Sequence, residues 1–314
     1  MEIKKFKAGD EKAILDLFKL AFNKEMTMEY WKWRFQDNPF SNEFMIHLMW
    51  EGDLLVGHYA ISPIEMIVND EVTKTALSMT TMTHPEYNGR GIFTQLSSSL
   101  YNELKEKYKY AMVWGFPNNN SHYAFIKNLK WKNLATIPML SLKRASFKKI
   151  ESDLNFEQHS NFTASLSQKL SSVNKVVRIN KTEKYFNWRY VTNPSADYKI
   201  ISINDEFGII VYKLIPSFSN SDKFEIDIME IQFNQNPIQL QELLSSILEL
   251  EKLEIEKFNL WVSIFSDDYL HYKKLGFVSQ MPITYLGCLN LASENKNLSQ
   301  YKEWDINIGY SDVF

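Results

Sequence analysis

The chain has 314 residues, of which 45% are hydrophobic and 23% are charged, and its formal net charge is −3. This composition is typical of a globular protein, and the length exceeds what one hydrophobic core usually serves. The weak negative charge gives no basic field of the kind that attracts nucleic acid, and no stretch approaches the roughly 18 apolar residues of a membrane span. With one cysteine and no signal-like apolar segment at its start, the sequence predicts a cytoplasmic protein that binds neither nucleic acid nor membrane.

The first segment predicts a short strand and then a helix. IKKF, residues 3–6, has a strand pattern, and the apolar residues of 11–23 recur at helical spacing, with Asp10 as a candidate N-cap. Three antiparallel strands follow before residue 83, because turn signals at Glu51-Gly52-Asp53 and Asn69-Asp70 separate the apolar clusters.

Beyond residue 83, helical and strand patterns alternate. The sequence predicts a helix over residues 93–107, a buried strand in YAMVWGFP, a short helix in SHYAFIKNL and strands in WKNLATIPMLSLKRA. The predicted order is β-α-β-β-β-α-β-α-β. Since this order mixes antiparallel and parallel pairs, it predicts an α/β fold of the α+β kind with a mixed sheet.

An internal repeat links the two halves of the chain. EYWKWRFQDNP at residues 29–39 returns as KYFNWRYVTNP at residues 184–194, with identical Tyr, Trp, Arg, Asn and Pro positions. We expect a scaffold role for this motif, with the tryptophan packed and the arginine bonded to backbone; a ligand role for Arg34 or Arg189 is the less favoured alternative. The repeat predicts two similar domains, at residues 1–145 and 179–314, joined by a polar linker at 146–178.

The segment HPEYNGRGIFTQL, residues 84–96, holds two of the chain's 10 glycines. Asn and Gly tolerate the positive φ of a tight turn, and a helix that starts directly after the turn presents unpaired N–H groups to a phosphate. Arg90 adds a cation nearby. Taken alone, a Gly-x-Gly pattern favours a plain strand-to-helix turn. The preceding antiparallel strands disfavour a Rossmann site, and the Gly-Lys-Ser/Thr of a P-loop is absent.

Together with the predicted element order, this segment resembles the GNAT superfamily of N-acetyltransferases, whose pattern is roughly Gln/Arg-x-x-Gly-x-Gly/Ala after a strand. The match is good at Gly91 and in the surrounding HPEYNGRGI. It departs at Asn88 and at Phe93, where the family usually has a small residue. The resemblance covers residues 1–142, and residues 180–290 only through the repeat. It implies two tandem GNAT-like domains, the second degenerate.

The resemblance implies acetyl-CoA as co-substrate, held largely by main-chain groups. In the family, N–H groups of this turn hold the pyrophosphate, and the preceding strand bonds the pantetheine arm like an extra strand. Carried over to this sequence, the predicted cofactor-binding residues are Met82, Thr83, Asn88, Gly89, Arg90, Gly91, Ile92, Phe93, Thr94 and Asn119. No metal site is predicted.

The catalytic residues are less clearly marked. Acetyl transfer needs a neutral amine, an acid for the leaving thiolate and a polarised thioester carbonyl. The family's acidic tyrosine, in a motif like Asn…Tyr-x-x-x-Gly-Phe, falls here on Ile126. Tyr123, one helical turn earlier, is the candidate acid, with packing against the sheet as its alternative. Glu65 is the candidate base, acting through water, and His122 is either a base or a surface residue.

The second half shows the converse pattern. HYKKLGF, residues 271–277, fits the tyrosine motif at Tyr272, but the glycine turn is missing and Pro237 opens the corresponding helix. We therefore expect CoA to bind only in the first half and an amine on a small molecule to be the acceptor. Two alternatives remain at this stage: a Fem-like transferase that uses aminoacyl-tRNA, and a non-catalytic CoA-binding module.

Overall fold

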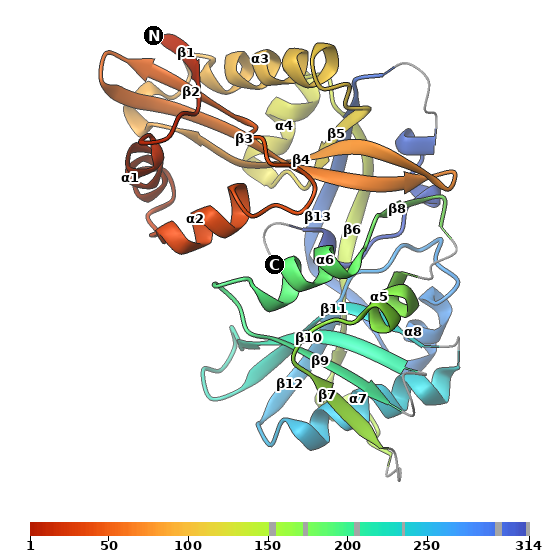
Figure 1. Ribbon diagram of the computed structural model, residues 1–314. Coiled ribbons are helices and arrows are strands. Elements are labelled where there is room, and N and C mark those ends of the chain that lie inside the picture. Colours follow the sequence, from red (N-terminus) through yellow and green to blue (C-terminus); the bar gives the residue numbers. More distant parts are fainter. Residues whose placement is uncertain (151–154, 172–174, 204–207, 234–235, 293–296, 312–314) are drawn as a thin grey trace. The chain divides into compact units, whose positions relative to one another are not determined.

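The computed structural model describes residues 1–150, 155–171, 175–203, 208–233, 236–292 and 297–311 (Figure 1). The chain divides into two compact units. Unit 1 combines Met1–Ala135 with Tyr285–Tyr301, and unit 2 combines Thr136–Thr284 with Lys302–Phe314. Both units have a mixed sheet with helices packed on it, so the predicted α/β fold class is confirmed.

Unit 1 is built on the strand order β1-β2-β3-β4-β5-β13, in which only β4 and β5 are parallel neighbours. Its elements are β1 (Glu2–Lys5), α1 (Glu11–Phe22), α2 (Met28–Phe35), β2 (Ile46–Glu51), β3 (Leu54–Val68), β4 (Glu71–Thr83), α3 (Ile92–Glu106), β5 (Met112–Gly115), α4 (Asn119–Lys127) and the last residues of β13 (Val278–Asn290).

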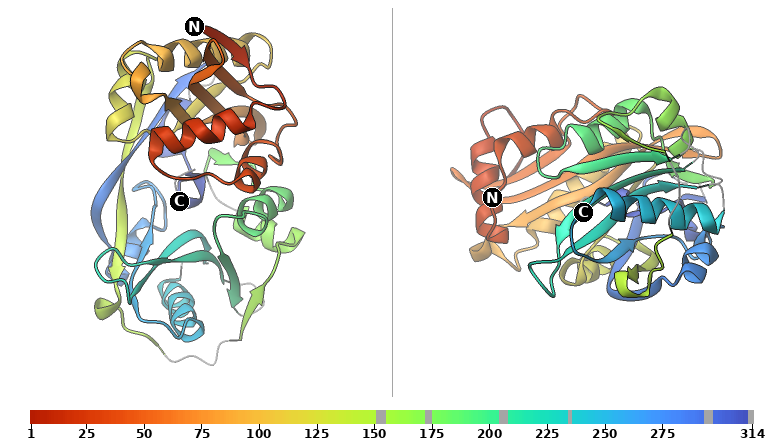
Figure 2. Two further views of the ribbon diagram at one scale, coloured as in Figure 1. Left: turned by 90° about the vertical axis from the view of Figure 1, so that its left-hand side faces the viewer. Right: turned by 90° about the horizontal axis from the view of Figure 1, so that it is seen from below.

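Alternating side chains of the unit 1 strands cover both faces of the sheet. On one face, α3 and α4 pack through Leu96, Leu100 and Phe125 onto β2 and β3. On the other face, α1 and α2 pack through residues such as Leu17 and Trp31 onto β2, β3 and β4, as Figures 1 and 2 show. Helices on both faces are what a sheet with two apolar sides requires.

Local turn chemistry agrees with the sequence at the hairpins but not at the first helix. Asn69 and Asp70 both have positive φ in the turn between β3 and β4, as the Asn-Asp signal predicts. Asp10 precedes α1 but does not cap it with its side chain, since its carboxylate accepts the N–H of Lys7 instead. Asp10 is thus the N-cap residue of α1 by position, as predicted, but its side chain makes no capping bond. Helix α2 was not foreseen as a separate element.

Unit 2 repeats the strand arrangement with different connections. Its strand order is β6-β12-β11-β10-β9-β7, with β11 and β12 parallel. Its elements are β6 (Lys132–Lys143), β7 (Phe156–His159), α5 (Ala164–Ser171), β8 (Val177–Ile179), α6 (Glu183–Phe186), β9 (Tyr198–Ile203), β10 (Gly208–Pro216), β11 (Phe224–Gln232), α7 (Pro237–Leu250), β12 (Ile255–Leu260) and α8 (Tyr269–Leu275).

The two sheets exchange strands. Strand β6 follows α4 in the chain, yet its residues Leu140–Lys143 pair with β12 of unit 2. Strand β13 follows α8, yet its residues Gly287–Asn290 pair with β5 of unit 1. Each sheet is therefore completed by a strand from the other half of the sequence.

The repeated motif has the same local structure in both halves. Thr27 and Thr182 cap the two helices in the same way, each accepting the backbone N–H of the tyrosine three residues later. Trp33 and Trp188 are both buried. The guanidinium of Arg189 donates to the carbonyl oxygens of Gly309 and Ser311, so the expected backbone bonding of the arginine is confirmed in the second half.

Candidate functional site

The glycine turn leads directly into α3. Gly89 has φ +78° and Gly91 has φ +73°, the left-handed region in which glycine is favoured. A Cβ at Gly89 would meet no atom within 4 Å, and one at Gly91 would meet only the side-chain nitrogen of Gln95. Both glycines are therefore required by backbone conformation and not by crowding from the protein itself.

The first turn of α3 presents a row of amide groups. The first helical hydrogen bond runs from the N–H of Gln95 to the carbonyl of Gly91, so the N–H groups of Ile92, Phe93 and Thr94 have no acceptor within the helix. Gly91 cannot cap them with a side chain, and the first turn contains no acidic residue. The helix dipole adds positive potential at the same point. This arrangement suits an anion such as a diphosphate.

Neighbouring side chains hold the turn in place. The guanidinium of Arg90 lies over the ring of Tyr87, with 4.5 Å between its Cζ and the ring centre. Phe93 packs its ring against Phe125, with 5.0 Å between ring centres. This large side chain, the departure from the family pattern, is thus directed into the core between α3 and α4.

The position of α3 depends on a close approach to β3. A Cβ at Gly57 would lie 2.3 Å from Cγ2 of Ile92, the first residue of the helix. That distance is far shorter than any non-bonded carbon contact, so only glycine at this position lets the helix N-terminus lie as close to the sheet as it does.

The neighbouring strand edge is open beside this helix. Strand β4 pairs with the parallel strand β5 only through Thr75, Ala76 and Leu77, whereas β4 itself continues to Thr83. Within the described residues, Ser78, Met79, Met82 and Thr83 thus pair with β3, and no strand pairs with residues 78–83 on the β5 side. A sheet edge of this kind can accept an extended ligand arm as an added strand. Met82 and Thr83, predicted for this role, both lie on it.

A bulge interrupts β4 in the middle of the open edge. The register against β3 shifts between His58 and Ala60, and Thr80 has φ +48°. The imidazole of His58 fixes the bulge, because its Nδ1 lies 2.7 Å from the carbonyl oxygen of Thr80 and must donate to it. The ring is fully buried, and burial lowers the pKa of His58 to about 4, so the imidazole is neutral at pH 7.

This burial predicts a pH-dependent stability. The folded-state pKa of His58 lies below its unfolded value, so the unfolded state binds more protons between about pH 4 and pH 6.5. The stabilisation by neutral His58 is complete above pH 6.5 and is lost as the pH falls toward 4. We expect the free energy of unfolding of the wild type to fall by about 3 kcal/mol more than that of a His58→Gln variant over this pH interval, because glutamine does not titrate. Urea unfolding of both proteins at pH 7 and pH 4 measures the difference; parallel losses would contradict the assignment.

A second set of polar side chains lies on the α3 face of the same strands. The hydroxyl of Tyr59 lies 2.7 Å from Oγ of Ser78 and 2.6 Å from the hydroxyl of Tyr101. Burial raises the pKa of Tyr59 well above its usual value. Sequence reasoning missed both this cluster and His58, because isolated polar residues in apolar strands carry no pattern of their own.

The predicted acid and base lie elsewhere. Tyr123 is 62% exposed on α4, so it does not pack against the sheet, and its hydroxyl accepts a hydrogen bond from Lys127. Glu65 lies on β3 opposite Lys74 of β4. Lys74 precedes Thr75, the first residue of β4 that pairs with β5. At about 3.3 Å per residue, Glu65 is roughly 20 Å along the strands from the bulge. The structure therefore brings neither residue to the bulge.

The remaining polar residues of this region have structural contacts. Asn118 caps α4, since its side chain accepts the N–H groups of Asn120 and Ser121, and Asn119 is the exposed first residue of that helix. His122 stacks on Tyr285, with 4.0 Å between ring centres. Ile126, at the family's tyrosine position, packs against the core.

The second half lacks the row of free amides. Pro237 has no N–H group, and the side chain of Asn236 accepts the N–H of Ile238. Tyr272, which fits the tyrosine motif, is 2% exposed in the core of unit 2, where it packs against Phe233 and Phe277. In the second half the row of free amides is thus absent, and the tyrosine that fits the family motif is buried.

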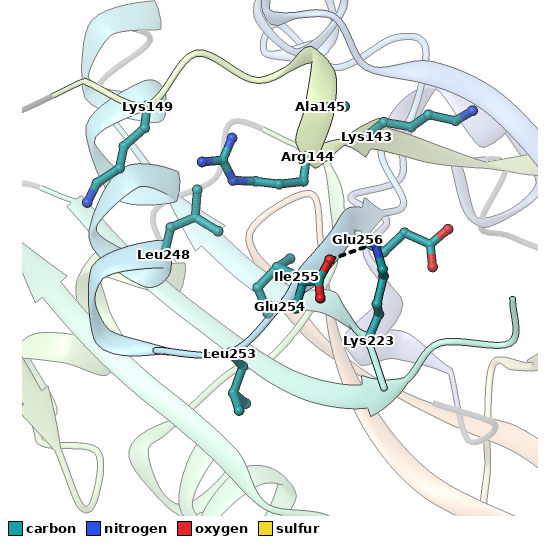
Figure 3. A pocket seen from close by; sticks show the side chains of 10 residues that line it. All are labelled: Lys143, Arg144, Ala145, Lys149, Lys223, Leu248, Leu253, Glu254, Ile255 and Glu256. Carbon is teal, nitrogen blue, oxygen red and sulfur yellow. Dashed lines mark ion pairs between the residues drawn. The ribbon is translucent and has the colours of Figure 1, made fainter. Parts of the chain in front are cut away.

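Unit 2 contains a pocket of about 620 Å³ with charged walls (Figure 3). Both of its carboxylates are bonded to other protein groups: Glu254 pairs with Lys223 at 2.7 Å, and Glu256 accepts the hydroxyl of Ser219. The pocket therefore offers no unpaired carboxylate that would act as a catalytic base.

No helix among the described residues is long and apolar enough to cross a lipid bilayer.

Comparison with known proteins agrees with this geometry. Residues 2–133 match the family described as "Acetyltransferase (GNAT) domain". Among solved structures, a probable N-acyltransferase from Enterococcus faecalis V583 has a TM-score of 0.70 at 14% identity, over 92% of this chain and 72% of that one. A GCN5-related N-acetyltransferase from Anabaena variabilis gives 0.69 at 12% identity, over 93% and 73%. Eis1 from Mycobacterium abscessus gives 0.62 at 11% identity, over 96% and 76%.

At such low identities the structural likenesses establish the fold alone, and no curated protein matches the sequence at a significant level. The family match carries the assignment, and it spans the glycine turn, the bulge and the open edge of β4. Residues 2–133 therefore form a GNAT acetyltransferase domain, and the protein is an acetyltransferase.

Proposed function

We propose that the protein transfers an acetyl group from acetyl-CoA to a primary amine of a small molecule. One observation supports this proposal above the others: the uncapped amides of Ile92, Phe93 and Thr94 lie at the N-terminus of a helix without acidic residues in its first turn. A diphosphate matches them in charge and in hydrogen bonding.

The remaining cofactor-binding roles follow from the same arrangement. The diphosphate would lie against the turn at Asn88–Thr94, and the pantetheine arm would run along the open edge at Met82 and Thr83. Bound acetyl-CoA would supply the thioester, whose carbonyl carbon an amine attacks with release of the CoA thiol. Asn119 stays a candidate for a contact with the arm. The roles proposed for Tyr123 as acid and Glu65 as base have no support from the distances described above.

We further propose that only the first half binds the co-substrate and that the second half is a degenerate copy. The support is the contrast between Gly91 of α3, which has no side chain to cap the helix, and Asn236 of α7, whose side chain occupies the first amide.

Calorimetry and a thiol-release assay test the proposal together. We expect titration of the purified protein with acetyl-CoA to give one site per chain, and amino acids, polyamines, amino sugars or aminoglycosides to stimulate thiol release. A stoichiometry of two would contradict the restriction to the first half. Absence of binding would contradict the whole proposal, and binding without thiol release for any amine would indicate a CoA-binding module.

A further inference from the structure

The α2 face of the bulge carries a buried positive charge that has no carboxylate partner among the described residues. The side chain of Arg34 is 3% exposed; its Nε contacts the thioether sulfur of Met79 at 3.2 Å, and its Cζ lies 5.7 Å from the centre of the Trp33 ring. Its Nη2 is buried and has no hydrogen-bond partner among the described residues. A guanidinium stays protonated at every accessible pH, and a thioether is a weak acceptor. Buried charges in proteins are usually paired with an opposite charge, and among the described residues Arg34 has only the Trp33 ring and the Met79 sulfur as neighbours of its guanidinium.

The repeat shows what such an arginine binds when its surroundings are complete. Arg189, the counterpart of Arg34, donates through Nη2 to the carbonyl of Ser311 at 3.0 Å, through Nε to the carbonyl of Gly309, and through Nη1 to the hydroxyl of Tyr198. Oxygen acceptors thus satisfy all three nitrogens in the second half. The same motif in the first half presents the guanidinium to the strand bearing the bulge.

A second buried polar atom faces the same side of the sheet. His58 donates through Nδ1 to Thr80, which leaves Nε2 as an acceptor, and this atom also has no partner among the described residues. Its ring contacts Phe35, the neighbour of Arg34 on α2. Met79, which contacts Arg34, stands opposite Ala60, and Ala60 lies two residues along β3 from His58. Met79 and His58 are therefore separated by about 7 Å along the strand direction.

We propose that Arg34 binds the carboxylate of the acceptor, so that the acceptor is an amine that also carries a carboxylate, such as an amino acid. This inference rests on the proposed function and narrows its acceptor class. A carboxylate matches the fork of the guanidinium and compensates its charge, which a neutral carbonyl would not do. The Nε2 lone pair of His58 accepts a hydrogen from the amino group of the same molecule.

The decisive test uses binding and not turnover. N-acetylglycine, which carries the carboxylate, and N-acetylglycinamide, which does not, are titrated into the full-length protein and into Arg34→Met by calorimetry. We expect the acid to bind wild type at least about 10-fold more tightly than the amide, and this preference to disappear in Arg34→Met. Equal affinities in wild type, no binding of either probe, or an unchanged preference in the variant would overturn the proposal.

Thermal unfolding separates a ligand role from a structural one. Since the Arg34 guanidinium makes so few bonds, Arg34→Met should melt at the wild-type temperature or above it. Arg189→Met removes three hydrogen bonds and should melt lower. A lower melting temperature for Arg34→Met would indicate a scaffold role instead. The affinity of Arg34→Met for acetyl-CoA should equal that of wild type. If wild type itself fails to bind acetyl-CoA, the proposed function is contradicted, while the preference for N-acetylglycine over N-acetylglycinamide can still be measured.

Discussion

Replacement of Gly91 by glutamate should abolish acetyl-CoA binding, with a loss of affinity of about 100-fold or more. Three effects act in the same direction. The φ of +73° at this position disfavours any side chain, the new carboxylate competes for the free amides of the first helical turn, and its charge repels the diphosphate. Isothermal titration with acetyl-CoA measures the effect directly.

A matched control separates the anion site from backbone strain. Gly52 also has positive φ, +58°, and a Cβ there would meet no atom within 4 Å, but it lies in the turn between β2 and β3. Gly52→Glu therefore introduces the same charge and a similar strain, and we expect it to bind acetyl-CoA like wild type. Equal losses in both variants would contradict a diphosphate site at Gly91.

Replacement of Lys181 by methionine should cost about 3–5 kcal/mol in the free energy of unfolding. The ammonium of Lys181 is buried in unit 2, 2.8 Å from a carboxylate oxygen of Glu230 and 3.4 Å from one of Asp305. Without it, Glu230 would remain as a buried charge with hydrogen bonds from Tyr190 and Asn307 as its remaining contacts among the described residues. Urea unfolding at pH 7 measures the loss.

The pH dependence identifies the cause of this loss. Burial raises the pKa of Glu230, so the folded state takes up a proton at Glu230 at a higher pH than the unfolded state does. Protonation removes the unpaired charge, so the loss of stability in Lys181→Met should shrink as the pH falls toward 4.5. Adding Glu230→Gln should recover part of the stability at pH 7. As a control, Lys223→Met removes an ion pair to the exposed Glu254 and should change stability little. A deficit that is independent of pH would point to packing in place of charge.

Much of unit 1 could be predicted because its signals are local. Turn residues set the hairpins, the apolar spacing of α1 and α3 placed both helices within one residue of their ends, and the glycine turn marked the helix N-terminus. Helix α2 was missed because Trp33, Arg34 and Phe35 are buried in succession, so no polar face shows in the sequence.

The centre of the site could not be predicted because it depends on contacts between distant residues. The bulge at Thr80 shows only in the register of β4 against β3, and His58 gains its role through a bond to a backbone carbonyl 22 residues away. Likewise, nothing in MEYWKWRF indicates that Arg34 would lie against Met79. Glu65 was named as a candidate base because it lies on a strand of the correct half, without knowledge of where β4 and β5 separate.

The exchange of strands has a consequence for dissecting the molecule. Strand β5, which borders the gap beside β4, is held on its other edge by Gly287–Asn290, from the last tenth of the chain. A fragment that stops after β6 would leave β5 with a bare edge and would expose the unpaired backbone to aggregation. The two halves of the chain are therefore not separable modules, because neither half alone carries all the strands of its own sheet. A change in Gly287–Asn290 would disturb β5, and with it the strand beside the acetyl-CoA site proposed above.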